Sequence, residues 1–274
     1  MSNKYIDTHC HLLKEYFVND NEIQKEVKEA FISGVGRIIL PGTQIDNSWE
    51  AIETSQNFSN VYPAFGVHPS DSKKQYELID DALKKLDPNQ IIALGEIGLD
   101  LYWEDNPKIS IQEDVLRKFI EYGIKNNLPL ILHMRNAEED MIRILSDSKY
   151  NGQIKFIIHS CTTNPKWIPK FLEIGGYISF SGIVTFRNAK EVQESAKLVP
   201  LNKILTETDA PYLSPTPHRG KTNKPSYLPH TTKFLAKLRG EDLTEFIDAV
   251  WNNANKIFDF SKLDNKKNER VNNE

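Results

Sequence analysis

The sequence IDTHCHL occupies residues Ile6–Leu12, and the apolar run around Ile6 predicts a short buried strand. Side chains alternate along an extended strand, so residues i and i+2 point the same way. His9 and His11, at the end of this predicted strand, therefore direct two imidazoles to one point. Asp7 shares their register and can orient them. This stretch predicts one half of a metal site, which the rest of the chain has to complete.

Seven further apolar segments predict short strands, at residues 37–42, 61–69, 91–100, 128–137, 153–161, 176–182 and 203–212. Helical spacing of apolar residues separates them, at residues 21–34, through Trp49 and Ile52, and at 78–86, 111–125, 138–145, 167–174 and 189–198. In the segment 78–86 the spacing predicts that Leu78 lies on the apolar, buried face. Eight alternating units in a chain of this length favour an α/β fold, a single (β/α)8 TIM barrel, over an open sheet. We expect one hydrolase barrel over residues 1–260 and a polar, disordered tail over 261–274.

Residues able to bind metal follow the predicted strands at the point where each strand ends. They are His9, His11, His68, Glu96, His133, His159 and Asp209. In a (β/α)8 barrel the carboxyl ends of the strands share one face, and that face holds the active site. One histidine at a strand end is ordinarily a hydrogen-bonding residue. Several imidazoles and carboxylates buried together need a compensating cation.

The donor types favour two divalent ions. Imidazole with carboxylate suits zinc or manganese and, more weakly, magnesium. The six best ligands exceed the three or four that one catalytic zinc takes; they are His9, His11, Glu96, His133, His159 and Asp209. Glu96 is the natural bridge between two ions, and a water between them is the expected nucleophile. Asp209 can hold and deprotonate that water, so Glu96 and Asp209 are the predicted catalytic residues.

Composition narrows the class of substrate and the compartment. The net charge is −4 and the pI about 6.0, which argues against a protein that grips a long duplex through many phosphates. A short single-stranded end in a local pocket stays compatible with this charge. Cys10 and Cys161 form no CxxC pair, which fits a reducing compartment. Cys10 alternates away from the histidines and is expected to pack in the core, whereas Cys161 stays a weak ligand candidate. We expect a cytoplasmic protein with no membrane association and no obligate protein partner.

Taken with these motifs, the sequence from Ile6 to about Phe258 resembles the TatD family of metal-dependent deoxyribonucleases, within the amidohydrolase superfamily. The matching segments after IDTHCHL are GVHP (66–69), GEIGLD (95–100), LILHMRNA (130–137), IIHS (157–160), SFSGIVTFRNA (179–189), ETDAPYLSPTPHRGKTNKPSYL (207–228) and NNANKIF (252–258). The last strand and the loop after it are the most specific of these for the family.

The resemblance implies a role for each site residue. One ion is held by His9, His11 and Asp209, the other by His133 and His159, and Glu96 bridges both. Substrate phosphate is implied to bind at His68, Arg135, His218, Arg219 and Lys221. One departure stands out, because family members commonly follow the histidine of the sixth strand with a segment such as HCFSG, whereas here it reads HSCTTNP (159–165). Either the substrate preference differs or the loop is a neutral variant.

The function implied is hydrolysis of DNA phosphodiester bonds by a metal-bound hydroxide. The expected enzyme is a TatD-type deoxyribonuclease, a 3′–5′ exonuclease on single-stranded ends with a part in DNA repair, and its partner is the DNA substrate. Two divalent ions, zinc, magnesium or manganese, are the expected cofactors. Two alternatives stay open: a hydrolase of a phosphomonoester, amide or aminoacyl ester on the same barrel, and a non-catalytic metal-binding subunit. Relatives in the superfamily often bridge their metals with a carboxylated lysine, so Glu96 at that position favours the TatD type.

Overall fold

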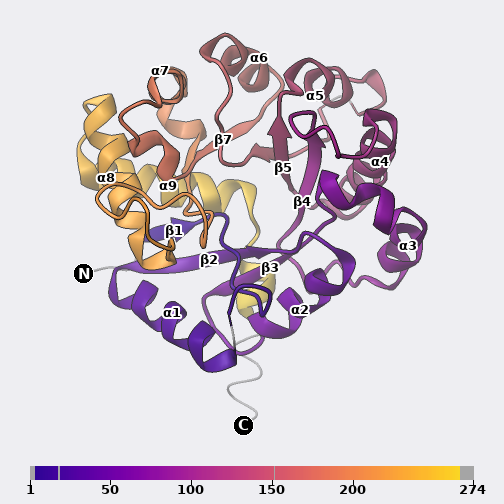
Figure 1. Cartoon of the computed structure of the whole chain (residues 1–274), viewed down its shortest axis with the longest axis horizontal. Coiled ribbons are helices and arrows are strands. Elements are labelled where there is room, and N and C mark those ends of the chain that lie inside the picture. The colour runs from indigo at the N-terminus through magenta and orange to yellow at the C-terminus, as the bar shows by residue number, and fades with distance from the viewer. Residues whose placement is uncertain (1–3, 18, 151, 266–274) are drawn as a thin grey trace. The chain divides into compact units, whose positions relative to one another are not determined.

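Eight parallel strands alternate with helices along the chain, and they form one sheet in the order β1 to β8 (Figure 1). The computed structural model describes residues 4–17, 19–150 and 152–265. The strands are β1 (Tyr5–Asp7), β2 (Val35–Pro41), β3 (Val61–Phe65), β4 (Ala93–Asp100), β5 (Leu130–Arg135), β6 (Phe156–Ile158), β7 (Tyr177–Phe180) and β8 (Ile204–Thr206). This order and alternation are those of a (β/α)8 barrel, so the predicted fold class is confirmed.

The helices follow the strands in the expected alternation. The α-helices are α1 (Asp20–Ile32), α2 (Ile45–Ser55), α3 (Ser72–Lys85), α4 (Ile109–Asn126), α5 (Glu138–Leu145), α6 (Ile168–Glu173), α7 (Lys190–Leu198), α8 (Leu228–Arg239) and α9 (Leu243–Ile257). Short 3-10 helices are η1 (Pro69–Asp71), η2 (Ser148–Tyr150), η3 (Pro165–Trp167), η4 (Gly182–Thr185), η5 (Leu201–Lys203) and η6 (Pro225–Tyr227).

The contacts group the chain into two compact units. The first unit comprises residues 1–38 and 157–254, and the second comprises 39–156 and 255–274. In the first unit β1 pairs with β2, and β7 pairs with both β6 and β8. The backbone N–H of Thr8 also donates to the Thr206 carbonyl over 3.2 Å, which places the end of β1 beside β8. In the second unit β4 pairs with both β3 and β5.

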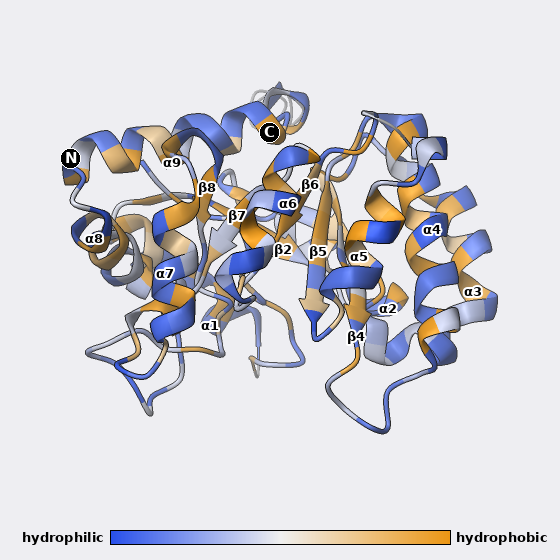
Figure 2. Ribbon diagram, turned by 90° about the horizontal axis from the view of Figure 1, so that it is seen from above, coloured by the Kyte–Doolittle hydropathy of each residue, from blue (hydrophilic) through white to orange (hydrophobic). Residues whose placement is uncertain are grey.

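Burial explains why these segments are strands and helices. Every residue of β4 is buried, as expected for a parallel strand covered on both faces. Helix α4 buries Val115, Leu116, Phe119 and Ile120, the spacing of one helical face. Figure 2 shows α3 and α4 side by side, each carrying hydrophobic residues on one side and hydrophilic residues on the other. The amphipathic pattern therefore determines which side of each helix packs inward.

Two helical features differ from the sequence-based expectation. Helix α3 begins at Ser72 rather than near Leu78, because its first turns bury polar Ser72 and Gln75 and so lack an apolar signal. Leu78, expected on the buried face, is 56% exposed. Helices α8 and α9 are absent from the sequence-based prediction, although Gly240 ends α8 in the left-handed conformation that favours glycine.

Several strands are shorter than predicted, because the chain leaves the sheet before the candidate ligands. Strand β1 ends two residues before His9, and β6 ends directly before His159. Asp209 lies beyond β8 at φ +56°. His9, His159 and Asp209 therefore project from loops that begin at the strand ends, whereas Glu96 and His133 lie within β4 and β5. Of the expected tail, residues 261–265 are helical, with Leu263 buried, and residues 266–274 lie outside the described part.

Candidate metal centres

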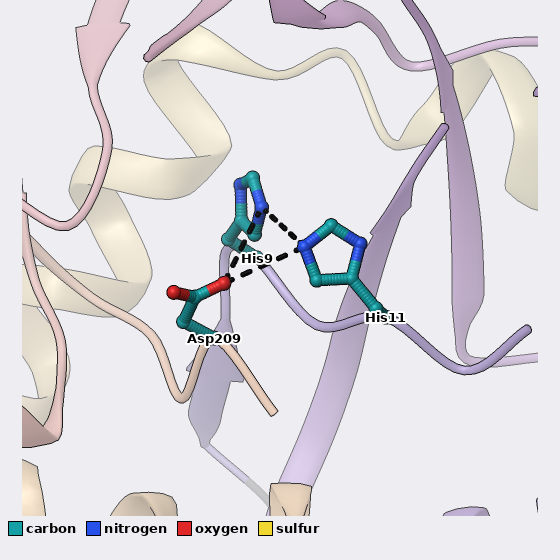
Figure 3. Close-up of side chains that lie close together, drawn as sticks. All are labelled: His9, His11 and Asp209. Carbon is teal, nitrogen blue, oxygen red and sulfur yellow. Dashed lines mark hydrogen bonds and ion pairs between the residues drawn. The ribbon is translucent and has the colours of Figure 1, made fainter. Parts of the chain in front are cut away.

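Three of the predicted ligands meet in the first unit: His9, His11 and Asp209 (Figure 3). The Nε2 atoms of the two histidines lie 3.1 Å apart. The Asp209 Oδ1 atom lies 3.7 Å from the Nε2 of His9 and 3.5 Å from that of His11. Ligands at about 2.0–2.1 Å around a tetrahedral ion lie about 3.3 Å from one another. The spacing and chemistry of these three donors therefore fit one divalent cation.

Backbone hydrogen bonds between β1 and the end of β8 position this cluster. The Asp209 N–H donates to the His9 carbonyl over 2.9 Å, and the His11 N–H donates to the Ala210 carbonyl over 2.8 Å. The left-handed conformation of Asp209 turns the chain at this point. The two segments thus form a short ladder beyond the strands, and the three donors project from it.

Asp7 stabilises the same ladder through hydrogen bonds to both of its segments. Its carboxyl group accepts the backbone N–H of Thr208 over 2.8 Å and the Thr208 hydroxyl over 2.6 Å. It also accepts the His9 N–H at 3.4 Å. Burial raises the pKa of Asp7 to about 8, although the hydrogen bonds from Thr208 oppose this shift. Asp7 therefore orients the histidines through the backbone that carries them.

Asp209 is kept ionised by its neighbours. Burial tends to raise the pKa of this carboxyl, but the hydrogen bond with His11 and the positive charges of His9 and His159 outweigh burial and lower it. A carboxylate that stays ionised inside a group of imidazoles can bind a cation or accept a proton at neutral pH.

His159 lies against the same cluster, and it has a carboxylate partner that the sequence analysis missed. Its ring stacks on that of His9, with centroids 4.0 Å apart. Its Nδ1 lies 3.2 Å from Oε1 of Glu207, which is fully buried. A carboxylate on one ring nitrogen fixes the tautomer and leaves the other nitrogen for a metal. The sequence signal for Glu207 is the ETD triplet, which places a second carboxylate two residues before Asp209.

A second cluster forms in the second unit from His68, Glu96 and His133. Glu96 Oε1 lies 2.9 Å from Nδ1 of His133 and 3.6 Å from Nε2 of His68. The two rings meet edge to face with centroids 4.4 Å apart. His68, expected to bind substrate, therefore lies among the candidate ligands themselves. This donor set also fits a divalent cation.

Asp100 supports this second cluster and was not singled out from the sequence. Its Oδ2 lies 3.1 Å from Nε2 of His133, and its Oδ1 accepts the Tyr102 N–H over 2.9 Å. Burial opposes ionisation, but the hydrogen bonds from His133 and Tyr102 and the nearby positive charge lower the pKa of Asp100. Alternation along β4 puts Glu96, Gly98 and Asp100 on one side, so the GEIGLD motif carried this signal.

Gly98 is required for this arrangement. It adopts φ +146°, and a Cβ there would overlap the carbonyl oxygen of His133. Strand β4 can therefore lie close enough to β5 to place two carboxylates on the ring of His133 only with glycine at this position.

The predicted phosphate-binding residues lie in both units. In the second unit the Arg135 guanidinium lies 3.7 Å from the ring centroid of Tyr102. In the first, the His218 ring stacks on Tyr227, with centroids 3.8 Å apart, and Arg219 lies over the ring of Phe186. Lys221 is exposed in the same loop.

The loop that carries these last residues is tied to the first cluster. The Asn223 side chain donates to the Thr208 carbonyl over 2.8 Å, next to Asp209. The Ser214 hydroxyl donates to the Lys221 carbonyl over 2.6 Å. These bonds hold the basic loop at the end of β8.

Both cysteines are buried. Burial raises the pKa of Cys10 well above its ordinary value, so this thiol is neutral and packs in the core as expected. Within residues 4–17, 19–150 and 152–265, none of the potential ligand clusters contains Cys161. In the HSCTTNP loop, the hydroxyls of Ser160 and Ser181 lie 2.8 Å apart.

Comparisons with known proteins give consistent matches over almost the whole chain. The family model described as TatD related DNase matches residues 6–259. The chain is 37% identical over 246 residues to an uncharacterized metal-dependent hydrolase, BU355, from Buchnera aphidicola, covering 87% of this chain and 92% of that protein. It is 34% identical over 253 residues to the uncharacterized metal-dependent hydrolase YabD from Bacillus subtilis, covering 92% and 98%.

Among solved structures, the TatD homologue YJJV from Escherichia coli superposes with a TM-score of 0.85 at 28% identity. The match covers 94% of this chain and 99% of that one. No helix in the described part of the chain has both the length and the apolar character needed to cross a bilayer.

Proposed function

We propose that this chain, which belongs to the TatD related DNase family and is a metal-dependent hydrolase, cleaves phosphodiester bonds of DNA and removes nucleotides from single-stranded 3′ ends. The single observation that carries this proposal is the cluster of His9, His11 and Asp209, whose donor atoms fit one divalent cation at the end of β1 and β8. Phosphodiester hydrolysis is a reaction in which such cations are widely used.

The two clusters are proposed to bind one divalent ion each. Zinc and manganese suit the histidine-rich donor sets better than magnesium does, because magnesium prefers oxygen ligands. When bound, the ions supply Lewis acidity and activate water for attack on phosphorus. The bridging role expected for Glu96 and the pairing of His159 with His133 stay predictions.

Other steps of the proposed reaction are assigned to residues of the chain. Asp209, ionised and hydrogen-bonded to His11, is proposed as the general base that accepts the proton of the attacking water. Glu207 orients His159, and Asp100 orients His133. Arg135 is proposed to contact a non-bridging phosphate oxygen and stabilise the charge that develops there.

A matrix of metals against substrates tests this proposal. Purified protein is stripped with chelator, reloaded with zinc, manganese or magnesium, and given single-stranded DNA labelled at the 5′ or the 3′ end. We expect release of mononucleotides from the 3′ end, visible as a shortening ladder on the 5′-labelled strand. RNA, a phosphomonoester and an aminoacyl ester form the other arms. If the protein turns over one of these substrates rapidly but leaves the DNA uncleaved, the proposal is contradicted.

A further inference from the structure

Two large aromatic side chains lie exposed in the loop that follows β4. Tyr102 is 48% and Trp103 is 54% exposed. Their rings meet edge to face, with centroids 4.8 Å apart and an interplanar angle of 89°. Single exposed apolar side chains are ordinary, whereas exposed apolar side chains that lie together are a feature of binding surfaces. The pair therefore presents a specific apolar surface to solvent.

Arg135 completes this surface. Its guanidinium carbon lies 3.7 Å from the ring centroid of Tyr102 and 5.3 Å from that of Trp103. A guanidinium that stacks on an aromatic face keeps its N–H groups in its own plane, where they can still donate to phosphate. The group formed by Tyr102, Trp103 and Arg135 therefore combines a flat apolar face with an anchored positive charge.

The loop is fixed to the second cluster of candidate ligands. Asp100 accepts the Tyr102 N–H and also lies against His133. The Leu101 N–H donates to the Arg135 carbonyl over 2.9 Å. The side chains of Asn106 and Gln112 both donate to the Asp100 carbonyl. The aromatic surface is thus held by the same short segment that orients His133.

We infer that Tyr102, Trp103 and Arg135 form a stacking platform for single-stranded DNA. One nucleobase stacks on Trp103, and Arg135 holds the phosphate of the neighbouring nucleotide. This inference rests on the proposed function and adds to it the residues that bind the base. Because the net charge of the chain is −4, a general attraction for phosphate is weak, and stacking supplies the affinity that charge does not.

Single-stranded binding surfaces of this kind are tolerant of sequence, because every base has a flat face to stack. The platform therefore predicts a preference for single-stranded over duplex ends without strong base selectivity. It also offers an aromatic surface in a chain whose HSCTTNP loop has none.

Binding measurements on Trp103 variants test the platform. Metal-loaded protein is titrated with a labelled single-stranded phosphorothioate oligonucleotide, which resists hydrolysis. Trp103→Ala should weaken binding by roughly 5- to 150-fold, which at about 1.4 kcal/mol per tenfold corresponds to the loss of one stacked base, about 1–3 kcal/mol. Trp103→Phe, which keeps a stacking ring, should stay within about threefold. Leu78→Ala, at another exposed apolar side chain of the second unit, is the matched control and should bind like wild type.

Steady-state kinetics separate this inference from the proposed function. With single-stranded DNA, Trp103→Ala should raise KM more than it lowers kcat, whereas kcat/KM on methyl p-nitrophenyl phosphate should stay unchanged. If Trp103→Ala and wild type both hydrolyse DNA and bind the oligonucleotide with equal affinity, the platform is overturned and the proposed function stands. Loss of oligonucleotide affinity in Trp103→Ala, in a protein that hydrolyses no DNA, would support the platform and overturn the proposed function.

Discussion

The backbone N–H of Asp209 donates to the carbonyl of His9 over 2.9 Å. The candidate ligand that follows the last strand, β8, is therefore hydrogen-bonded to one that follows the first strand, β1. Thr8 and Thr206 form the bond before it, and His11 and Ala210 the bond after it. Any change that separates β1 from β8 therefore also separates the donor atoms of the first cluster.

Removal of one imidazole from this cluster should remove one cation. His11→Ala leaves His9 and Asp209, two donors where a divalent ion needs three or more, so we expect the metal content to fall by about one ion per chain. Elemental analysis after gel filtration measures this. His230→Ala is the matched histidine control in the same unit. An unchanged metal content in His11→Ala would rule out this cluster as a metal site.

Glu207 should matter for metal affinity without being a ligand itself. Glu207→Gln replaces the carboxylate that lies on Nδ1 of His159, and partners of this kind are typically worth 10–100-fold in metal affinity. Calorimetric titration of stripped protein with zinc should show such a weakening. Equal affinity in wild type and Glu207→Gln would show that Glu207 does not orient His159.

Gly98 should resist substitution. A Cβ at this position would overlap the His133 carbonyl oxygen, and the positive φ adds backbone strain, so Gly98→Ala should lower the free energy of unfolding by more than about 2 kcal/mol. The control is Gly175→Ala, where φ is also positive but nothing lies within 4 Å of the added Cβ. Urea unfolding of both variants measures the difference. A smaller loss at Gly98 than at Gly175 would contradict this account.

His230 should reduce stability in acid. Burial lowers the pKa of His230 first, and the positive charges of His218 and Lys233 lower it further. The unfolded chain then binds a proton near pH 6.5 that the folded chain takes up only at lower pH, so the stability falls as the pH drops below about 6.5. His230→Gln should lose less stability than wild type between pH 7.5 and 5.5. Thermal unfolding midpoints measure this, and a constant difference between the two proteins would exclude the effect.

The sequence predicts the fold class and the convergence of ligands for one physical reason. Parallel barrel strands are buried on both faces, so they read as apolar runs, and a polar residue where such a run stops is conspicuous. Asp100 ends β4 and Glu207 directly follows β8, but the sequence does not predict their roles, because each acts through a histidine in or directly after another strand. Leu78 is exposed, contrary to the prediction, because Ser72 and Gln75 take up the buried positions at the start of α3. The apolar residues alone therefore do not show which face of α3 is buried.

Asp209→Asn tests whether the cluster around Asp209 performs metal-dependent hydrolysis of DNA. This variant keeps the size of the side chain and the backbone bond to His9, but it loses the carboxylate charge. At matched metal content, we expect the rate of nucleotide release from single-stranded DNA to fall by about 10²- to 10⁴-fold, the usual range for loss of a general base. A rate equal to that of wild type at matched metal content would contradict the account.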